Sequence, residues 1–234
     1  MADTLTLGLP LLEAAQAQKH VTVNEALARL DAVTGGLVAS IGAVSPPAVV
    51  DGEAHVVGLG ATGDWAGQDG ALAYAVNGGW AFVAPATGMA VTDTTGARHA
   101  YLGGSWVEGA VAGGAGGAAT LARVVAVDHD VAAGATSTAV AAIPAGSVVI
   151  GVSARVEQAL GGASSWQLGV AGSADRYGSG LGVAANSYAA GITGQPQAYY
   201  AATDLVLTAS GGDFTAGRLR LAVHLLAIVP PPAF

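Results

Sequence analysis

The hydrophobic positions divide the chain into a short helical region and a long region of strands. Between residues 22 and 41, apolar side chains recur at spacings of three and four, the period of one helix face. Thr22 and Glu25 have the spacing of a capping box, in which each side chain bonds to a free amide at the helix start. The pattern predicts one amphipathic helix that begins at Thr22 and weakens at Gly35-Gly36. Its apolar stripe consists of Val23, Ala26, Leu27, Leu30, Val33, Leu37 and Ile41.

Two similar segments follow Pro46-Pro47, which favours extended backbone and ends the helical pattern. "GALAYAVNGGW" (70–80) and "GARHAYLGGSW" (96–106) both place a tyrosine and a tryptophan on either side of a glycine-rich turn. Asn77-Gly78 and Gly103-Gly104 can adopt the positive φ angles that tight hairpin turns require. The repeat predicts two β-hairpins, each stabilised by its aromatic pair, within a small module.

Alternation of apolar and polar residues dominates the last half of the chain. One predicted strand places five apolar side chains on a single face: Val148, Ile150, Val152, Ala154 and Val156. The same period of two recurs in three further groups: Trp166, Leu168 and Val170; Leu205 and Leu207; Leu219, Leu221, Val223 and Leu225. Several short strands separated by turns, with no helical pattern between them, predict an antiparallel sandwich.

We therefore expect a mainly β protein: an N-terminal helix, a small β-hairpin module and a C-terminal antiparallel β-sandwich of jelly-roll type. The predicted parts are a docking or oligomerisation segment (1–42), the hairpin module (43–109), and the sandwich as receptor-binding domain (121–234). Residues 110–120, in "EGAVAGGAGGAAT", are rich in glycine and alanine and predict a flexible linker. An amphipathic helix cannot bury its stripe alone, so Leu27, Leu30, Val33 and Leu37 are predicted to contact another surface or other copies of the chain.

Composition and charge exclude several classes of function. The net charge is −8, with one lysine and seven arginines, so the basic patch of a nucleic-acid-binding protein is missing. The absence of cysteine excludes disulfides, thiolate zinc sites and cysteine nucleophiles. Uncharged stretches are broken by glycine and proline, so no membrane insertion is expected. The start of the chain lacks the pattern of a signal peptide. No motif predicts a cofactor or a metal.

Two polar clusters contain side chains of the kinds found in catalytic or metal sites. His20, Asn24 and Glu25 fit a capped helix better than a ligand set, because zinc usually takes three or four His, Cys or carboxylate ligands. In "DHD", Asp128 and Asp130 share a strand face and flank His129 on the other face. The separation of such carboxylates is compatible with a glycosidase pair, but an exposed strand edge is the favoured interpretation.

The segment 170–200 contains the most distinctive polar and aromatic residues of the predicted sandwich. Aromatic rings can stack on sugar CH groups while charged side chains bond to hydroxyls, so the segment predicts a carbohydrate site. An ordinary loop with core tyrosines is the alternative. The candidate residues are Asp175, Arg176, Tyr177, Tyr188, Tyr199 and Tyr200.

The ordered series "LGLPLLEAAQAQKHVTVNEALARLDAV", "DGEAHVVG", "GATGDWAGQDGALAYAVNGGWAFVAPATGM" and "GSWV" resembles an uncharacterised domain family. That family occurs in structural proteins of tailed phages and gene transfer agents of alphaproteobacteria, and the resemblance covers about residues 5–109. The remainder, with "IPAGSVVIGVSARV", "SSWQLGVAG" and "YYAATDLVLTASGGDFTAGRLRLAVHLL", is similar to the sandwich that often follows this domain in head-spike fibres of gene transfer agents.

The resemblance implies a non-enzymatic spike or fibre on the surface of a phage-like particle, assembled in the bacterial cytoplasm and adhering to host capsular polysaccharide. Its partners would be other copies of itself in a trimer or pentamer, and a spike-base, capsid or tail protein. A capsule-degrading hydrolase and a tail-tip or baseplate structural protein are the alternatives.

Overall fold

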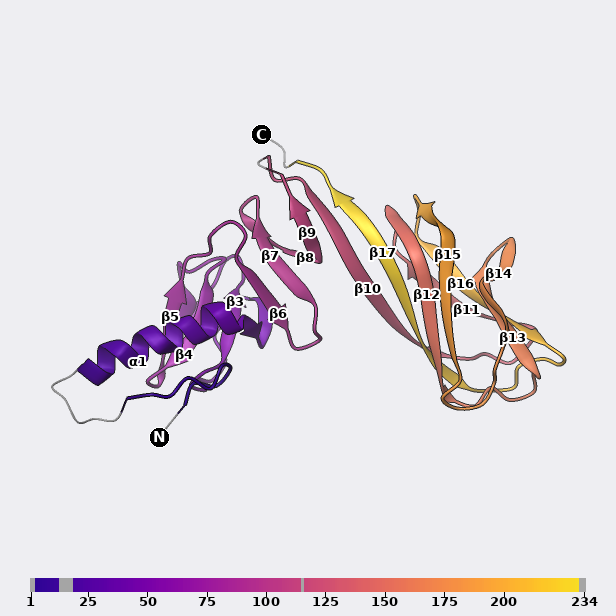
Figure 1. Cartoon of the computed structure of the whole chain (residues 1–234), viewed down its shortest axis with the longest axis horizontal. Coiled ribbons are helices and arrows are strands. Elements are labelled where there is room, and N and C mark those ends of the chain that lie inside the picture. Colours follow the sequence, from indigo (N-terminus) through magenta and orange to yellow (C-terminus); the bar gives the residue numbers. More distant parts are fainter. Residues whose placement is uncertain (1–2, 13–18, 115, 232–234) are drawn as a thin grey trace. The chain divides into compact units, whose positions relative to one another are not determined.

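The computed structural model describes residues 3–12, 19–114 and 116–231. The chain forms two compact units: residues 1–119 with 231–234, and residues 120–230. Strands predominate in both units, and the described part of the chain contains one α-helix (Figure 1). The mainly β fold predicted from the sequence is therefore confirmed.

The first unit combines the helix with two four-stranded sheets. The helix α1 (Lys19–Leu30) continues as one π-helical turn, η1 (Asp31–Gly35). One sheet has the order β1-β6-β7-β8 and the other β2-β3-β4-β5. Their bounds are β1 (Leu37–Val38), β2 (Ser40–Ala43), β3 (Ala54–Val57), β4 (Leu72–Val76), β5 (Gly79–Val83), β6 (Ala90–Asp93), β7 (Arg98–Leu102) and β8 (Ser105–Glu108). A short 3₁₀ turn, η2 (Gly63–Trp65), lies between β3 and β4.

The helix differs from its prediction at both ends. It already includes Lys19, so Thr22 lies inside the helix and the predicted capping box is wrong. It ends before Gly36, whose φ of +59° is a left-handed conformation that glycine adopts without steric cost. Leu37 and Ile41, predicted as helical, lie in β1 and β2. Helix and hairpins share a core, because Ala28, Ala32 and Val33 pack with residues of β3 and β4.

Both predicted hairpins are present, but only one has the predicted aromatic pair. β4–β5 turns at Asn77-Gly78 and β7–β8 at Gly103-Gly104, all four with positive φ. Tyr101 lies directly opposite Trp106, with ring centroids 5.5 Å apart. Tyr74 instead pairs with Ala81 and Trp80 with Ala75, so Tyr74 and Trp80 point to opposite faces of their hairpin. The first hairpin's predicted pair is therefore wrong by one register position.

The predicted linker contains regular structure. β9 (Ala110–Gly113) follows β8, and β10 (Ala119–Asp130) begins at the boundary between the units. The amide of Gly114 donates to the carbonyl of Ala118, and the amide of Gly117 donates to the carbonyl of Gly114. The predicted flexibility of residues 110–120 stays a prediction.

The second unit is a sandwich of two sheets, each with four strands from this unit, which Figure 1 shows as two layers. One sheet has the order β15-β12-β17-β10 and the other β11-β16-β13-β14. Consecutive strands alternate between the sheets except at β13–β14, which are neighbours in one sheet, and this is the arrangement of an eight-stranded jelly roll. The remaining bounds are β11 (Thr136–Ile143), β12 (Ser147–Gln158), β13 (Ser165–Val170), β14 (Ser173–Leu181), β15 (Tyr188–Tyr199), β16 (Thr203–Ser210) and β17 (Arg218–Val229).

The core of this unit agrees with the predicted alternation except at one bulge. The apolar residues predicted in β13, β16 and β17 are all buried. In β12 the register shifts between Val149 and Gly151, so Ile150 is 40% exposed rather than packed beside Val152. The bulge turns Ile150 toward solvent, and the single inward face predicted for Val148 to Val156 is wrong at its start.

Candidate functional site

The structure does not bring the six predicted carbohydrate-binding residues into one cluster. Tyr177 is buried in the core of the sandwich and its hydroxyl lies 2.8 Å from that of Tyr199. Burial raises the pKa of Tyr177, which keeps the phenol neutral. With 2% of its surface exposed, the ring of Tyr177 has no face open to a ligand. Its burial corrects its predicted role as a surface platform and indicates that it packs β14 against β15.

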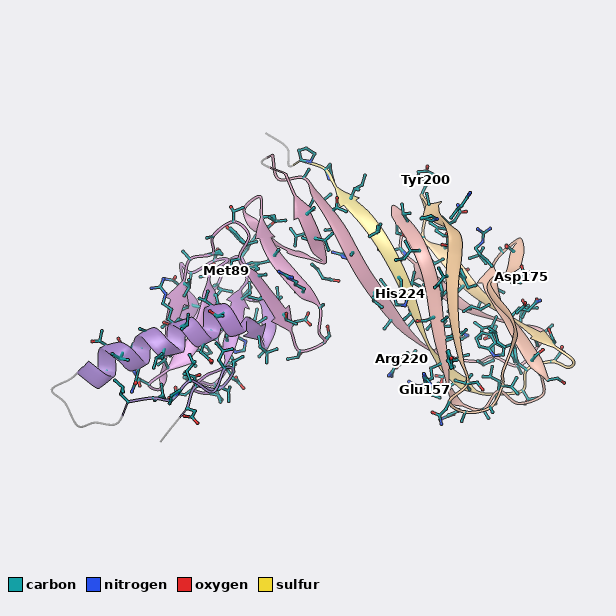
Figure 2. All side chains as sticks on the ribbon, in the orientation of Figure 1. Met89, Glu157, Asp175, Tyr200, Arg220 and His224 are labelled. Atoms are coloured by element: carbon teal, nitrogen blue, oxygen red, sulfur yellow. The ribbon has the colours of Figure 1, made fainter. Side chains whose placement is uncertain are left out.

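The other four candidates are distributed over different parts of the unit. Arg176 on β14 donates to the side chain of Gln197 at 3.1 Å. Figure 2 shows Asp175 on the β14 side, while Tyr200 lies at the opposite end of the unit from Glu157 and Arg220. Tyr200 follows β15, and Tyr188 begins it, so the two exposed tyrosines are separated by the length of that strand. Tyr188 therefore lies apart from the candidates on β14 and at the end of β15, and carbohydrate binding stays a prediction.

Tyr188 lies in a different and more compact group of polar side chains. It pairs across the sheet with Arg155 of β12, whose guanidinium carbon is 5.4 Å from the centroid of the tyrosine ring. Arg155 also donates to the carbonyl of Asn186 at 2.9 Å, which fixes the guanidinium beside the ring. Tyr188 remains 68% exposed. The result is an aromatic ring held by a cation and open to solvent.

A network of ion pairs continues from Arg155 across the same sheet. Arg220 of β17 lies directly opposite Arg155. Its guanidinium donates to both carboxylate oxygens of Asp128, at 2.6 and 3.1 Å, and lies 3.2 Å from one carboxylate oxygen of Glu157. Arg218 contacts the same two carboxylates and Asp130 at 3.2–3.6 Å. The hydrogen bond from Arg220 lowers the pKa of Asp128, and the same bond raises the pKa of Arg220. These groups therefore stay charged around neutral pH.

Small residues make the sheet surface beside this network shallow and open. Ser153 lies between Ala190 of β15 and Ala222 of β17. A depression of about 400 Å³ is lined by these three residues together with Ala154, Arg155, Glu157, Tyr188, Ala189 and Arg220. His224, whose Nε2 is 3.0 Å from the Ser153 hydroxyl, borders a second, mostly apolar depression that includes Ile150 and Ile192.

The two carboxylates of the "DHD" segment lie among arginines. Asp128 and Asp130 lie on the outer face of β10 with the arginines, as their spacing predicted. His129 points to the other face, where its Nε2 is 2.8 Å from the buried Ser137 hydroxyl. Burial lowers the pKa of His129. A glycosidase acid needs a raised carboxyl pKa, and that of Asp128 is lowered instead.

The predicted docking residues differ in exposure. Leu30 and Leu37 are about half exposed, at 50% and 51%, Leu27 is half-buried, and Val33 packs against the core of the first unit. Val23, one turn before Leu27, is also exposed. The outward face of α1 is thus more apolar than a solvated helix requires.

The N-terminal polar cluster does not form a ligand set among the described atoms. The amide group of Asn24 pairs with both backbone groups of Leu12 at 2.9 and 3.1 Å, and the side chain of His20 is outside the described residues. Within residues 3–12, 19–114 and 116–231, no group of three or more His, Asp or Glu side chains is placed to hold a metal ion. The described helix is too short to cross a membrane.

The remaining histidines of the first unit have structural contacts. His55 packs against Trp65 and Trp80 with ring centroids 5.5 Å away in each case, and its Nδ1 is 2.8 Å from the Ser40 hydroxyl. Burial in this aromatic cluster lowers the pKa of His55. His99 pairs with Asp93 at 3.1 Å.

The comparison with solved structures gives distant likenesses, of which one is a phage structure. A chain from the structure titled "Cyanophage Pam1 capsid asymmetric unit" is 22% identical, with a TM-score of 0.35, over 45% of this chain and 84% of that one. A TM-score this low supports no argument about fold or function. No curated protein matches the sequence.

The family comparison concerns the first unit. Residues 23–107, which lie within the region of the sequence resemblance, match the model of a family described as "Protein of unknown function (DUF2793)". The match begins inside α1 and ends in β8, so it contains both hairpins and the helix face that carries Leu27 and Leu30.

Proposed function

We propose that the chain is a structural spike or fibre protein of a phage-like particle, mounted through its first unit and adhering to host capsular polysaccharide through its second. The observation that carries this proposal is the presence of two exposed surfaces of different chemistry on separate units. The helix face around Leu30 is apolar, and the part of the β15-β12-β17-β10 sheet around Tyr188 and Arg155 is polar and aromatic.

The fold of the second unit supports the adhesive role. Eight-stranded jelly rolls occur in both viral capsid proteins and lectins. A shallow site of the Tyr188 type is expected to bind a single glycan weakly, near the millimolar range of about −4 kcal/mol. Useful adhesion would come from several copies in one homo-oligomeric spike, because each bound copy raises the effective concentration for the next.

The sequence resemblance to gene transfer agent head spikes supports a place on the particle surface. A spike base, capsid or tail protein would be the partner of the first unit. The polar network on β10, β12 and β17 favours binding over hydrolysis, since its described carboxylates are paired with arginines rather than held protonated.

Attachment to encapsulated cells tests the adhesive function directly. Fluorescently labelled protein is expected to bind encapsulated alphaproteobacterial cells at least about tenfold better than isogenic capsule-free cells, the ratio for a difference of 1.4 kcal/mol. The capsule should keep its chain length after incubation. Equal binding to both strains would exclude adhesion to capsule, and shortening of the polysaccharide would favour the hydrolase.

Leu30→Asp is expected to remove the protein from assembled particles. The substitution places an unpaired charge in the contact proposed for α1, at a cost of several kcal/mol, while Leu30 is exposed enough for the unit to stay folded. Immunoblots of purified particles measure occupancy. Leu59→Asp is the matched control, because Leu59 is 84% exposed and lies outside α1. Normal occupancy of the Leu30 variant would show that α1 is not the mounting surface.

A further inference from the structure

The exposed ring of Tyr188 has the features of a sugar-stacking platform. Arg155 is positioned near the ring, and the hydrogen bond to Asn186 holds the guanidinium in place. Most of the tyrosine surface remains open to solvent. A ring that is both fixed and exposed can stack on the CH face of a sugar with little loss of side-chain entropy.

The floor beside Tyr188 allows close approach of a ligand. Ala190, Ser153 and Ala222 form a row of small side chains across three strands. The depression of about 400 Å³ lies at the lower end of the range for ligand sites, roughly 300–1,000 Å³. Ser153 is part of its lining, and its hydroxyl, which is 3.0 Å from Nε2 of His224, has capacity for a further hydrogen bond.

The charges around the depression point to the class of sugar. Three arginines (Arg155, Arg218 and Arg220) and three carboxylates (Asp128, Asp130 and Glu157) lie in this group, so their formal charges cancel, and ion pairs join Arg218 and Arg220 to the carboxylates. Arg218 and Arg220 already bind carboxylates of the protein and would have to give up those contacts to bind an anionic ligand. Free N–H groups and carboxylate lone pairs can instead bond to neutral hydroxyls.

We propose that Tyr188, Arg155, Glu157 and Arg220 form a subsite for neutral sugar rings of a polysaccharide. The inference rests on the proposed adhesive function and specifies its location and ligand class. Tyr188 supplies the stacking surface. Arg155 positions that ring, while Glu157 and Arg220 accept from and donate to sugar hydroxyls.

Affinity electrophoresis of the full chain tests this subsite with two probes: neutral polysaccharides (a glucan, a mannan and a galactan) and polysaccharides rich in uronic acids. Wild type is expected to be retarded by at least one neutral polymer, to the same extent at low salt and at 0.5 M NaCl. Retardation only by uronic-acid polymers, lost at high salt, would overturn the neutral class, since screened charge attraction would then dominate.

Tyr188→Ala should weaken this retardation about tenfold, which corresponds to 1.4 kcal/mol, whereas Tyr188→Phe should retain it. Tyr200→Ala is the matched control, because Tyr200 is 91% exposed at the other end of β15. Unchanged binding by Tyr188→Ala, with wild type still attaching to encapsulated cells, would overturn the site alone. Failure of wild type to bind any capsule or polysaccharide would overturn the proposed function as well.

Discussion

Gly191→Ala is expected to destabilise the C-terminal sandwich by about 3 kcal/mol, the upper part of the usual range for overpacking. Gly191 lies in β15 where that strand passes over β14. A Cβ atom at this position would overlap the carbonyl oxygen of Tyr177 and approach its Cα and carbonyl carbon to 2.7 Å. These are backbone atoms, so no flexible side chain can move aside and the strands themselves would have to separate.

Gly194→Ala provides the control within the same strand. No atom lies within 4 Å of a Cβ built there, so its effect should stay within about 0.5 kcal/mol, as for most surface substitutions. Urea unfolding followed by far-UV circular dichroism and tryptophan fluorescence measures both variants. Equal stability of the two would mean that β14 and β15 are not as closely apposed as described.

The helix illustrates which part of the fold the sequence could predict. The stripe from Val23 to Leu30 identified a helix correctly, but the spacing of four between Leu37 and Ile41 fits a strand as well as a helix. Residues four apart lie on one face in both kinds of structure. The chain is not helical at Leu37 and Ile41 because Gly36 ends the helix. The Thr22–Glu25 spacing was a local coincidence, because residues before it already have helical backbone.

Register explains the remaining differences in the strands. The turn residues predicted both hairpins, yet one additional residue between Tyr74 and Trp80 places them on opposite faces. Ile150 fits the alternation of its neighbours, but the bulge beside it depends on pairing with β15 and β17, which a single segment does not encode. Alternation of apolar and polar residues therefore predicts a strand reliably, but it predicts the face of each side chain less reliably, because the register depends on the neighbouring strands.

The group of residues around Tyr188 could not be predicted from the sequence, because it also depends on how the strands pair. The sequence predicts Tyr188 as a carbohydrate-binding residue, but its partner Arg155 and the neighbouring Arg220 come from strands far away in the sequence. Tyr177 looked equally suitable among glycines and charged residues. Tyr177 is buried where the hydroxyl groups of Tyr177 on β14 and Tyr199 on β15 meet, and only the assembled sheets specify that contact.

Asp31→Asn is expected to release the N-terminal segment from the first unit at a cost of about 3 kcal/mol, since hydrogen bonds to charged groups contribute roughly 1.5–3 kcal/mol each. The buried carboxylate accepts from the amides of Thr6 and Leu7 at 3.0 and 2.6 Å and from the Thr4 hydroxyl at 2.8 Å. An amide side chain keeps the shape but replaces one acceptor with a donor. Hydrogen exchange of the Thr6 and Leu7 amides should therefore accelerate while that of β4 stays slow.

The pH dependence gives this prediction a second, independent readout. Burial alone would raise the pKa of Asp31, but the bonds from Thr6, Leu7 and Thr4 outweigh it and lower the pKa below its ordinary 3.8. The carboxylate therefore stabilises the segment fully above pH about 3.8, and this contribution is lost as the pH falls through the lower folded-state pKa.

In Asp31→Asn the protection of the Thr6 and Leu7 amides against hydrogen exchange should be low at every pH. Asp51→Asn is the control, because exposed Asp51 accepts from the amide of Gly78 in the β4–β5 turn. Protection of Thr6 and Leu7 that survives in Asp31→Asn would show that other contacts hold the segment in place.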